Sequence, residues 1–240
     1  MQVTPYKDSD QQKKQQVEQM FDQIAPKYDF LNHFLSLGID KLWRKKAIRI
    51  LSDFKSDEIL DVASGTGDFA IAASKLRPRK IVGFDLSEQM LNVGRTKVKQ
   101  LGLDGLIEFR KGDSEAMPFS DEQFDAIIVA FGVRNFENLE SGLKEFRRVL
   151  KNDGVVLILE FSKPKHFPMK QLYFFYFFKI LPLIGRMVSK DQSAYSYLPE
   201  SVMAFPDDQR FLDLLQRIGF SRTRQHRLTF GIATIYQAQK

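Results

Sequence analysis

The chain has 240 residues, of which 43% are hydrophobic and 28% charged, with a net charge of +6 and no cysteine. This size and composition fit a single globular domain with a full hydrophobic core. The lack of cysteine excludes disulfides, thiolate metal ligands and a cysteine nucleophile, and it is typical of a reducing cytoplasm. A basic surface favours nucleic acid or an anionic membrane face, although the same charge also serves solubility alone.

The N-terminal part of the chain predicts a tail followed by helices. Residues 1–15 are polar and offer little apolar surface, so we expect a flexible tail that lacks the apolar stretch of a secretory signal. From Val17 to Leu51 the apolar spacing is helical, with an interruption at Pro26, and we expect 16–55 to form a helical lid. No run of about 18 apolar residues occurs, so no membrane-spanning helix is expected.

Strand-like and helix-like segments alternate after residue 57, which indicates an α/β fold with a parallel, doubly wound sheet. Ser87 is placed to cap one helix and Gly219 to end another. The last two strands form an expected antiparallel hairpin at one edge. Strands are predicted at 58–62, 80–84, 106–110, 125–131, 155–160, 221–228 and 232–238, with helices at 88–101, 139–150 and 211–218.

A glycine loop follows the first predicted strand, with Asp61, Gly65, Thr66 and Gly67. Glycine lets a ligand approach the backbone, and the helix that follows favours negative groups at its N-terminus. The loop also fits the relaxed dinucleotide fingerprint. Because the Asp61 carboxylate would repel a pyrophosphate, we favour a ligand that carries an amino group and a sulfonium.

Acidic residues also end the next two strands. Asp85, followed by Leu86, is placed to accept both hydroxyls of a ribose, as in NAD enzymes. Asp113 and Ser114 are placed to bind an adenine amino group, and Met117 to pack on the adenine ring. The alternative is an acidic turn that leads into a solvated loop. Three such signals in series favour an adenosine-containing cofactor.

Several longer stretches are more specific than the glycine loop. Residues 21–25, 28–36 with Trp43, 131–136 and 148–162 resemble the quinone-biosynthesis C-methyltransferases, that is, the demethylmenaquinone and ubiquinone-pathway enzymes. The resemblance implies a seven-stranded methyltransferase sheet and S-adenosylmethionine as the cofactor. It further implies that a polyprenylated demethyl-quinol gains one methyl group on a ring carbon. We expect demethylmenaquinol, with a ubiquinone-pathway benzoquinol or both substrates as the alternative. The predicted cofactor contacts are Asp61, Gly65, Thr66, Gly67, Asp85, Leu86, Asp113 and Ser114.

Methylation of carbon needs an electron-rich ring but no metal, because the sulfonium methyl is already activated. Arg134 and Asn135 follow the fourth predicted strand, at the edge where parallel sheets bind ligands. We expect Arg134 to stabilise a developing phenolate and Asn135 to orient a hydroxyl or a water. Alternatively, Arg134 pairs with an acid such as Glu137, and Asn135 caps the next helix.

The helical lid supplies the expected substrate contacts, Tyr28, Asp29 and Asn32. His33 is a candidate base, although a single histidine in a lid is more often structural. We expect no metal site, since the remaining histidines show no metal-ligand spacing.

Residues 162–205 break the alternation and form an aromatic, proline-punctuated insertion over the expected active site. Its segment 172–184 is apolar nearly all round, with lysines and an arginine beside it. Such a segment must bury itself, either against the sheet as a roof or partly against a bilayer or an isoprenoid tail. We expect both roles, and a cytoplasmic protein with peripheral contact on the inner membrane face.

Other functions fit the residues less well. An RNA or protein methyltransferase would need clustered basic residues, and here they are scattered, so no nucleic-acid partner is expected. An NAD-dependent oxidoreductase is disfavoured by Asp61. A non-enzymatic quinone-binding protein on the same fold is the remaining alternative.

Overall fold

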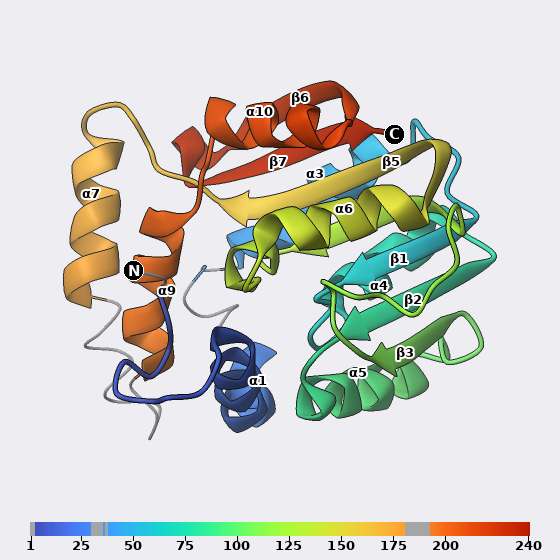
Figure 1. The fold of residues 1–240 in the computed structure, drawn as a ribbon, viewed down its shortest axis with the longest axis horizontal. Helices are drawn as coiled ribbons and strands as arrows, with labels where there is room; N and C mark the ends of the chain where they lie inside the picture. The colour runs from blue at the N-terminus through green and yellow to red at the C-terminus, as the bar shows by residue number, and fades with distance from the viewer. Residues whose placement is uncertain (1–2, 30–35, 37, 181–192) are drawn as a thin grey trace.

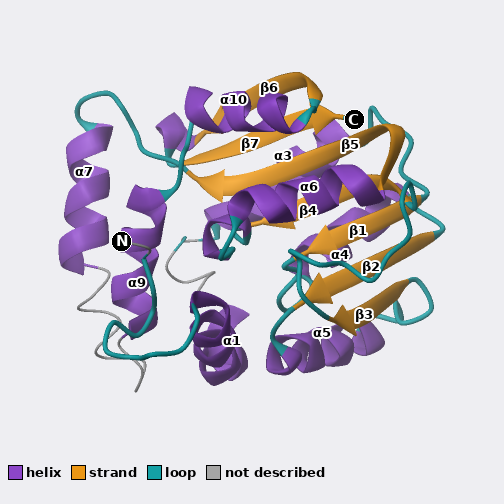
Figure 2. Cartoon of the chain, in the orientation of Figure 1, coloured by secondary structure: helices purple, strands orange, loops and turns teal. Residues whose placement is uncertain are grey.

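The computed structural model describes residues 3–29, 36, 38–180 and 193–240 (Figure 1). Within these residues a seven-stranded sheet forms the centre, in the order β3-β2-β1-β4-β5-β7-β6 (Figure 2). β1 to β5 pair in parallel, whereas β7 runs antiparallel to both β5 and β6. The predicted doubly wound sheet with a C-terminal hairpin is therefore confirmed. The strands are β1 (Glu58–Val62), β2 (Lys80–Asp85), β3 (Ile107–Lys111), β4 (Phe124–Ala130), β5 (Leu150–Phe161), β6 (Ser221–Leu228) and β7 (Ala233–Gln239).

Helices cover both faces of the sheet. α3 (Ile39–Leu51), α4 (Asp68–Ala73) and α5 (Glu88–Gln100) pack on one face, and α6 (Leu139–Val149) and α10 (Gln209–Ile218) on the other. β1 and β4 are buried almost throughout because they lie in the middle of the sheet between these two layers. Ser87 caps α5 by accepting the backbone N–H of Met90, and Gly219 ends α10 at φ 104°, as the sequence predicts.

The remaining helices gather beyond the carboxyl ends of the parallel strands (Figure 1). They are α1 (Lys13–Ile24), the short turns η1 (Ala25–Lys27) and η3 (Val133–Asn135), α7 (Met169–Phe175) with the π-helical turn η4 (Tyr176–Ile180), and α9 (Ser193–Ala204). η2 (Ser74–Leu76) and η5 (Thr229–Gly231) are further short turns. α7, η4 and α9, the described helices of residues 162–205, therefore lie beyond the end of the sheet where a ligand is expected.

The segment expected as a flexible tail has contacts of its own. α1 begins at Lys13, within residues 1–15, and the Tyr6 backbone N–H donates to Gln16 Oε1 at 2.8 Å. Val3 and Tyr6 pack against a small cluster formed by α1 and α9. The composition of the segment did not reveal this packing, since few of its described side chains are apolar.

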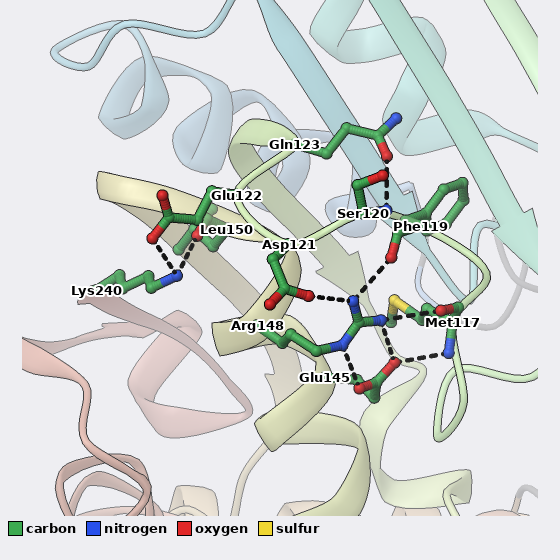
Figure 3. Close-up of polar contacts among 10 residues, drawn as sticks. All are labelled: Met117, Phe119, Ser120, Asp121, Glu122, Gln123, Glu145, Arg148, Leu150 and Lys240. Carbon is green, nitrogen blue, oxygen red and sulfur yellow. Dashed lines mark hydrogen bonds and ion pairs between the residues drawn. The ribbon is translucent and has the colours of Figure 1, made fainter.

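Arg148 at the end of α6 holds the loop between β3 and β4 (Figure 3). Its guanidinium donates to the carbonyl oxygens of Met117 and Phe119, and it pairs with the carboxylates of Asp121 and Glu145. Hydrogen bonds from Arg148 lower the pKa of Glu145. Arg148 opens one of the stretches that carry the family resemblance, and the structure assigns it this role in fixing a loop.

Candidate active site

The glycine loop after β1 takes its shape from left-handed residues, among them two glycines, Gly65 at φ 54° and Gly67 at φ 80°. The Gly67 N–H donates to the Ser64 carbonyl at 2.9 Å, which closes the turn. A Cβ at position 67 would lie 2.5 Å from the Phe109 ring. Glycine is therefore required at position 67 both by the backbone conformation and by the packing of β3 beneath the loop.

Asp61, near the end of β1, holds the helix that follows this loop. Its side chain is buried, and Oδ2 accepts the backbone N–H of Ala70 at 2.9 Å. Burial raises the pKa of the Asp61 carboxyl well above its usual value. The Asp61 carboxyl faces α4 and does not line the two pockets described below, in contrast to the predicted direct contact with the cofactor. Its Oδ1 has no hydrogen-bond partner among the described residues, and a role for Asp61 at the cofactor stays a prediction.

A first pocket lies at the tips of β1, β2 and β3, and its lining includes the predicted Gly65, Asp85, Leu86, Asp113 and Ser114. Asp85 Oδ2 accepts the N–H of Gly65 at 2.8 Å, and its Oδ1 accepts the N–H of Ser87 at 2.9 Å. Burial raises the pKa of the Asp85 carboxyl, against the effect of these backbone donors. The Leu86 N–H is a third backbone donor to this carboxylate, whose four lone pairs therefore keep part of their capacity for a ligand.

Helix α1 covers this pocket through polar contacts that the sequence did not indicate. Lys14 Nζ lies 2.6 Å from Asp113 Oδ2, and Asp22 accepts the Ser87 hydroxyl at 2.6 Å. Lys14 lines the pocket together with Asp113. The predicted lid is therefore fastened directly to the strand tips that were predicted to bind a cofactor.

The methionine at the first pocket is Met90 and not the predicted Met117. Met117, expected beside an adenine ring, is buried in the core near Phe119 on the face covered by α6 and α10. Met90, from α5, lines the first pocket, where its Cε would lie 3.5 Å from a Cβ at Gly65. The helical spacing of α5 gave no signal for this role, because a methionine on an inward helix face is usually part of the core.

A second pocket adjoins the first and has a volume of about 330 Å³. Tyr28, Phe131 and Asn135 line both pockets, so the two cavities meet at these side chains. Its walls are mainly aromatic and aliphatic, from α1, α3, α7, η4 and α9. A cavity of this size and character, with few polar groups, is typical of a site for an apolar small molecule.

Arg134 reaches the second pocket from η3 and pairs with an acid that was not predicted. Its Nη1 lies 2.9 Å from Oε1 of the fully buried Glu160, and it also donates to the Phe131 carbonyl. The alternative that Arg134 pairs with an acid is therefore confirmed, although the acid is Glu160 and not the suggested Glu137. Glu160 stands one residue before the end of β5, where a strand tip meets η3, and nothing in its sequence spacing marked it as the partner.

Asn135 does not cap the next helix, because Asn138 accepts the Ser141 N–H and caps α6. The Asn135 Nδ2 donates to the Phe131 carbonyl at 3.4 Å. Its Oδ1 is buried and has no hydrogen-bond partner within the described ranges. This oxygen lies where the two pockets meet and is available to a ligand.

The predicted substrate contacts from the lid differ in position. Tyr28 lines both pockets. Asp29 lies beside the glycine loop instead, where its Oδ1 accepts the Thr66 hydroxyl at 2.5 Å and its Oδ2 accepts Lys97 Nζ at 2.7 Å. Thr66 thus binds the lid rather than lining the first pocket. Asn32 and His33 lie outside the described residues.

Comparisons with known proteins agree with this arrangement. The model of the ubiE/COQ5 methyltransferase family matches residues 9–240. The demethylmenaquinone methyltransferase of Bacteroides fragilis is 52% identical over 239 residues, which cover 99% of this chain and 97% of the relative. The Porphyromonas gingivalis enzyme of the same name is 44% identical, covering 99% of this chain and 98% of the relative.

Solved structures support the fold. A SAM-dependent methyltransferase from Thermotoga maritima superposes with a TM-score of 0.65 at 19% identity, covering 93% of this chain and 99% of that one. At that identity the likeness speaks for the architecture alone, and the family is established by the sequence matches. The chain belongs to the ubiE/COQ5 methyltransferase family.

Proposed function

We propose that this S-adenosylmethionine-dependent enzyme methylates a ring carbon of a prenylated demethyl-quinol, namely demethylmenaquinol. The observation that carries the proposal is the meeting of a polar pocket at the strand tips with a larger apolar pocket. Tyr28, Phe131 and Asn135 line both. The names of the relatives from Bacteroides fragilis and Porphyromonas gingivalis support the naphthoquinol ring over the benzoquinol ring.

The residues of the first pocket fit S-adenosylmethionine. Asp85 offers free lone pairs to ribose hydroxyls, Asp113 and Ser114 offer acceptors to an adenine amino group, and the Gly65 backbone faces the cavity. When bound, S-adenosylmethionine would supply a methyl group already activated on a sulfonium.

The second pocket supplies orientation and electrostatics. The unpaired Asn135 Oδ1 accepts a hydrogen bond from a ring hydroxyl, which fixes the ring at the junction of the pockets. The Arg134 guanidinium, held by Glu160, stabilises negative charge that develops on the ring oxygen. The apolar walls exclude water from the reacting atoms. These groups act by positioning and charge.

Methyl transfer with purified protein tests this function. We expect a short-tailed demethylmenaquinol, kept reduced, to gain one methyl group by mass spectrometry and to be preferred over the matching benzoquinol. Asn135→Leu should lower kcat about 100-fold, the usual loss when an oriented polar group is removed from an active site. Asn138→Ala, which removes only the cap of α6, should keep kcat. No transfer to the naphthoquinol, or transfer to the benzoquinol alone, would refute the proposal.

We further propose that α7 contacts a membrane surface. Tyr173 and Phe177 turn inward to the second pocket, whereas Phe175 and Phe178 are 59% and 45% exposed. Leu172 is 55% exposed and also lines the pocket, so the cavity wall continues to the surface along this helix. Exposed aromatics with lysines beside them suit a bilayer interface. None of the described helices has both the length and the apolar character needed to cross a membrane.

Flotation with anionic liposomes tests the membrane contact. Phe175→Ser combined with Phe178→Ser should lower the bound fraction at least about fivefold, since each exposed ring removed takes apolar surface from the interface. Leu101→Ser removes an exposed apolar side chain at the far end of α5 and should leave binding unchanged. Equal binding by the wild type and the double variant would refute the contact.

A further inference from the structure

Two tyrosines of the aromatic insertion place hydroxyl groups in the second pocket. Tyr173 comes from α7 and Tyr197 from α9, and both side chains line the cavity. They are only 5% and 3% exposed. Neither hydroxyl has a hydrogen-bond partner within residues 3–29, 36, 38–180 and 193–240.

A buried hydroxyl without a partner destabilises the folded protein relative to one that is hydrogen-bonded. Phenylalanine would fill the same space at positions 173 and 197 without that cost, and the chain uses phenylalanine freely around them, as at 174, 177 and 178. The two hydroxyl groups are therefore best explained by a polar ligand group that completes their hydrogen bonds.

The chemistry of these groups makes them donors. Burial raises the pKa of both Tyr173 and Tyr197 above the usual value, so both phenols stay protonated at neutral pH. Arg134 lines the same cavity as both tyrosines, and α9, which carries Tyr197, packs against η3, which carries Arg134. Phenol donors next to a guanidinium suit an oxygen ligand that carries electron density.

The position of the tyrosines distinguishes them from Asn135. Asn135 lines both pockets, whereas Tyr173 and Tyr197 line the second pocket alone. A ring with two oxygens can therefore meet Asn135 with one oxygen, near the first pocket, and the tyrosines with the other. We propose that Tyr173 and Tyr197 donate hydrogen bonds to the ring oxygen farther from the first pocket and so select substrates with two ring oxygens. This inference rests on the proposed function.

The test compares two substrates and four proteins. The substrates are a short-tailed prenylated naphthalene-1,4-diol and its analogue that keeps only the hydroxyl next to the carbon that is methylated. The proteins are the wild type, Tyr173→Phe, Tyr197→Phe and the double variant. Each single change should lower kcat/KM for the diol about tenfold, the loss of roughly one hydrogen bond, and leave the mono-hydroxy analogue unchanged within about twofold. The preference for the diol should disappear in the double variant.

Thermal unfolding of the ligand-free proteins provides the structural control. Tyr173→Phe and Tyr197→Phe remove hydroxyls that have no partner in the described residues, so Tm should stay the same or rise. Tyr236→Phe is the matched control, because the Tyr236 hydroxyl accepts the Asp208 N–H at 2.7 Å, away from the cavity. It should lower Tm and leave the preference for the diol intact.

The outcomes separate the two proposals. If the wild type transfers no methyl group to the diol, the proposed function fails and this inference fails with it. If the wild type methylates the diol but the Phe variants lose both substrates equally, or keep the full preference, only the inference about Tyr173 and Tyr197 is overturned. A fall in Tm for the Phe variants would likewise overturn it, because the hydroxyls would then have structural partners.

Discussion

Glu160→Gln tests whether the buried ion pair with Arg134 positions the guanidinium. At 2.9 Å and an effective dielectric constant of about 20, the attraction between the charges is about 6 kcal/mol. Burial raises the pKa of the Glu160 carboxyl in spite of the Arg134 charge, so desolvation of the carboxylate opposes this attraction. Losing one member of a buried pair usually costs about 3–5 kcal/mol. Glu160→Gln leaves the Arg134 charge buried without its partner, so we expect the free energy of unfolding to fall. Because desolvation opposes the attraction in the wild type, we expect a fall near the lower end of this range, about 3 kcal/mol.

Urea denaturation at pH 7 measures the loss, and two further proteins decide its cause. Glu140→Gln breaks an exposed pair with Arg217 at the same 2.9 Å separation and should cost no more than about 1 kcal/mol. Combining Glu160→Gln with Arg134→Met removes both charges and should recover most of the stability, while methyl transfer stays low. If the free energy of unfolding of Glu160→Gln lies within about 0.5 kcal/mol of the wild-type value, the reasoning about the pair is wrong.

Two further predictions concern the fold. Gly67→Ala should lower the free energy of unfolding by about 3 kcal/mol in urea denaturation, because its Cβ would clash with a neighbour and the residue is left-handed. Gly102→Ala is also left-handed but has open space, and it should lower the free energy of unfolding by only about 1 kcal/mol. Equal losses for the two variants would contradict this prediction. Burial alone would raise the pKa of the Asp208 carboxyl. Hydrogen bonds from Lys165 and Arg227 outweigh this effect and hold the pKa well below its usual value. Asp208 therefore stabilises the fold above the unfolded pKa, and the deficit of Asp208→Asn at pH 7 should shrink below about pH 4; a deficit independent of pH would contradict it.

The sheet could be predicted from the sequence because each strand is a short apolar run bounded by turn residues. All seven predicted strands appear, and most of their ends shift by one or two residues. β5 is the exception, since it begins at Leu150 rather than near 155. Leu150 pairs with Phe124 before an irregularity in the register, and a pairing of this kind depends on the neighbouring strand. Local patterns could not show it.

Strand-tip residues could be predicted for the same reason. The end of a parallel strand fixes where its next side chain lies, so Asp85 and Asp113 were found in the first pocket. Asp61 belongs to the same pattern but turns toward α4, because its carboxyl satisfies a buried backbone N–H. A strand tip therefore predicts location well and hydrogen-bond partner poorly.

The second pocket depends on contacts between segments far apart in the chain. Glu160 meets Arg134 across two strand ends, and Tyr173 and Tyr197 line the same cavity from two helices of the insertion. Glu160, Tyr173 and Tyr197 each resemble ordinary core or strand residues in the sequence, since only the fold brings them together around one cavity. The apolar pattern of the insertion indicated that it covers the site and gave no sign that it also brings hydroxyl groups into it.

This division between the sheet and the insertion has a consequence for substitutions. The strand tips supply polar groups of the first pocket, and the insertion with η3 supplies several polar groups of the second. Changes at Asp85 should therefore weaken cofactor binding for every substrate, because they act on a pocket that the substrate ring does not fill. Changes at Tyr173 or Tyr197 should alter the choice among substrates and leave cofactor affinity unchanged. Relatives of this fold can thus keep one cofactor while the insertion changes the molecule that receives the methyl group.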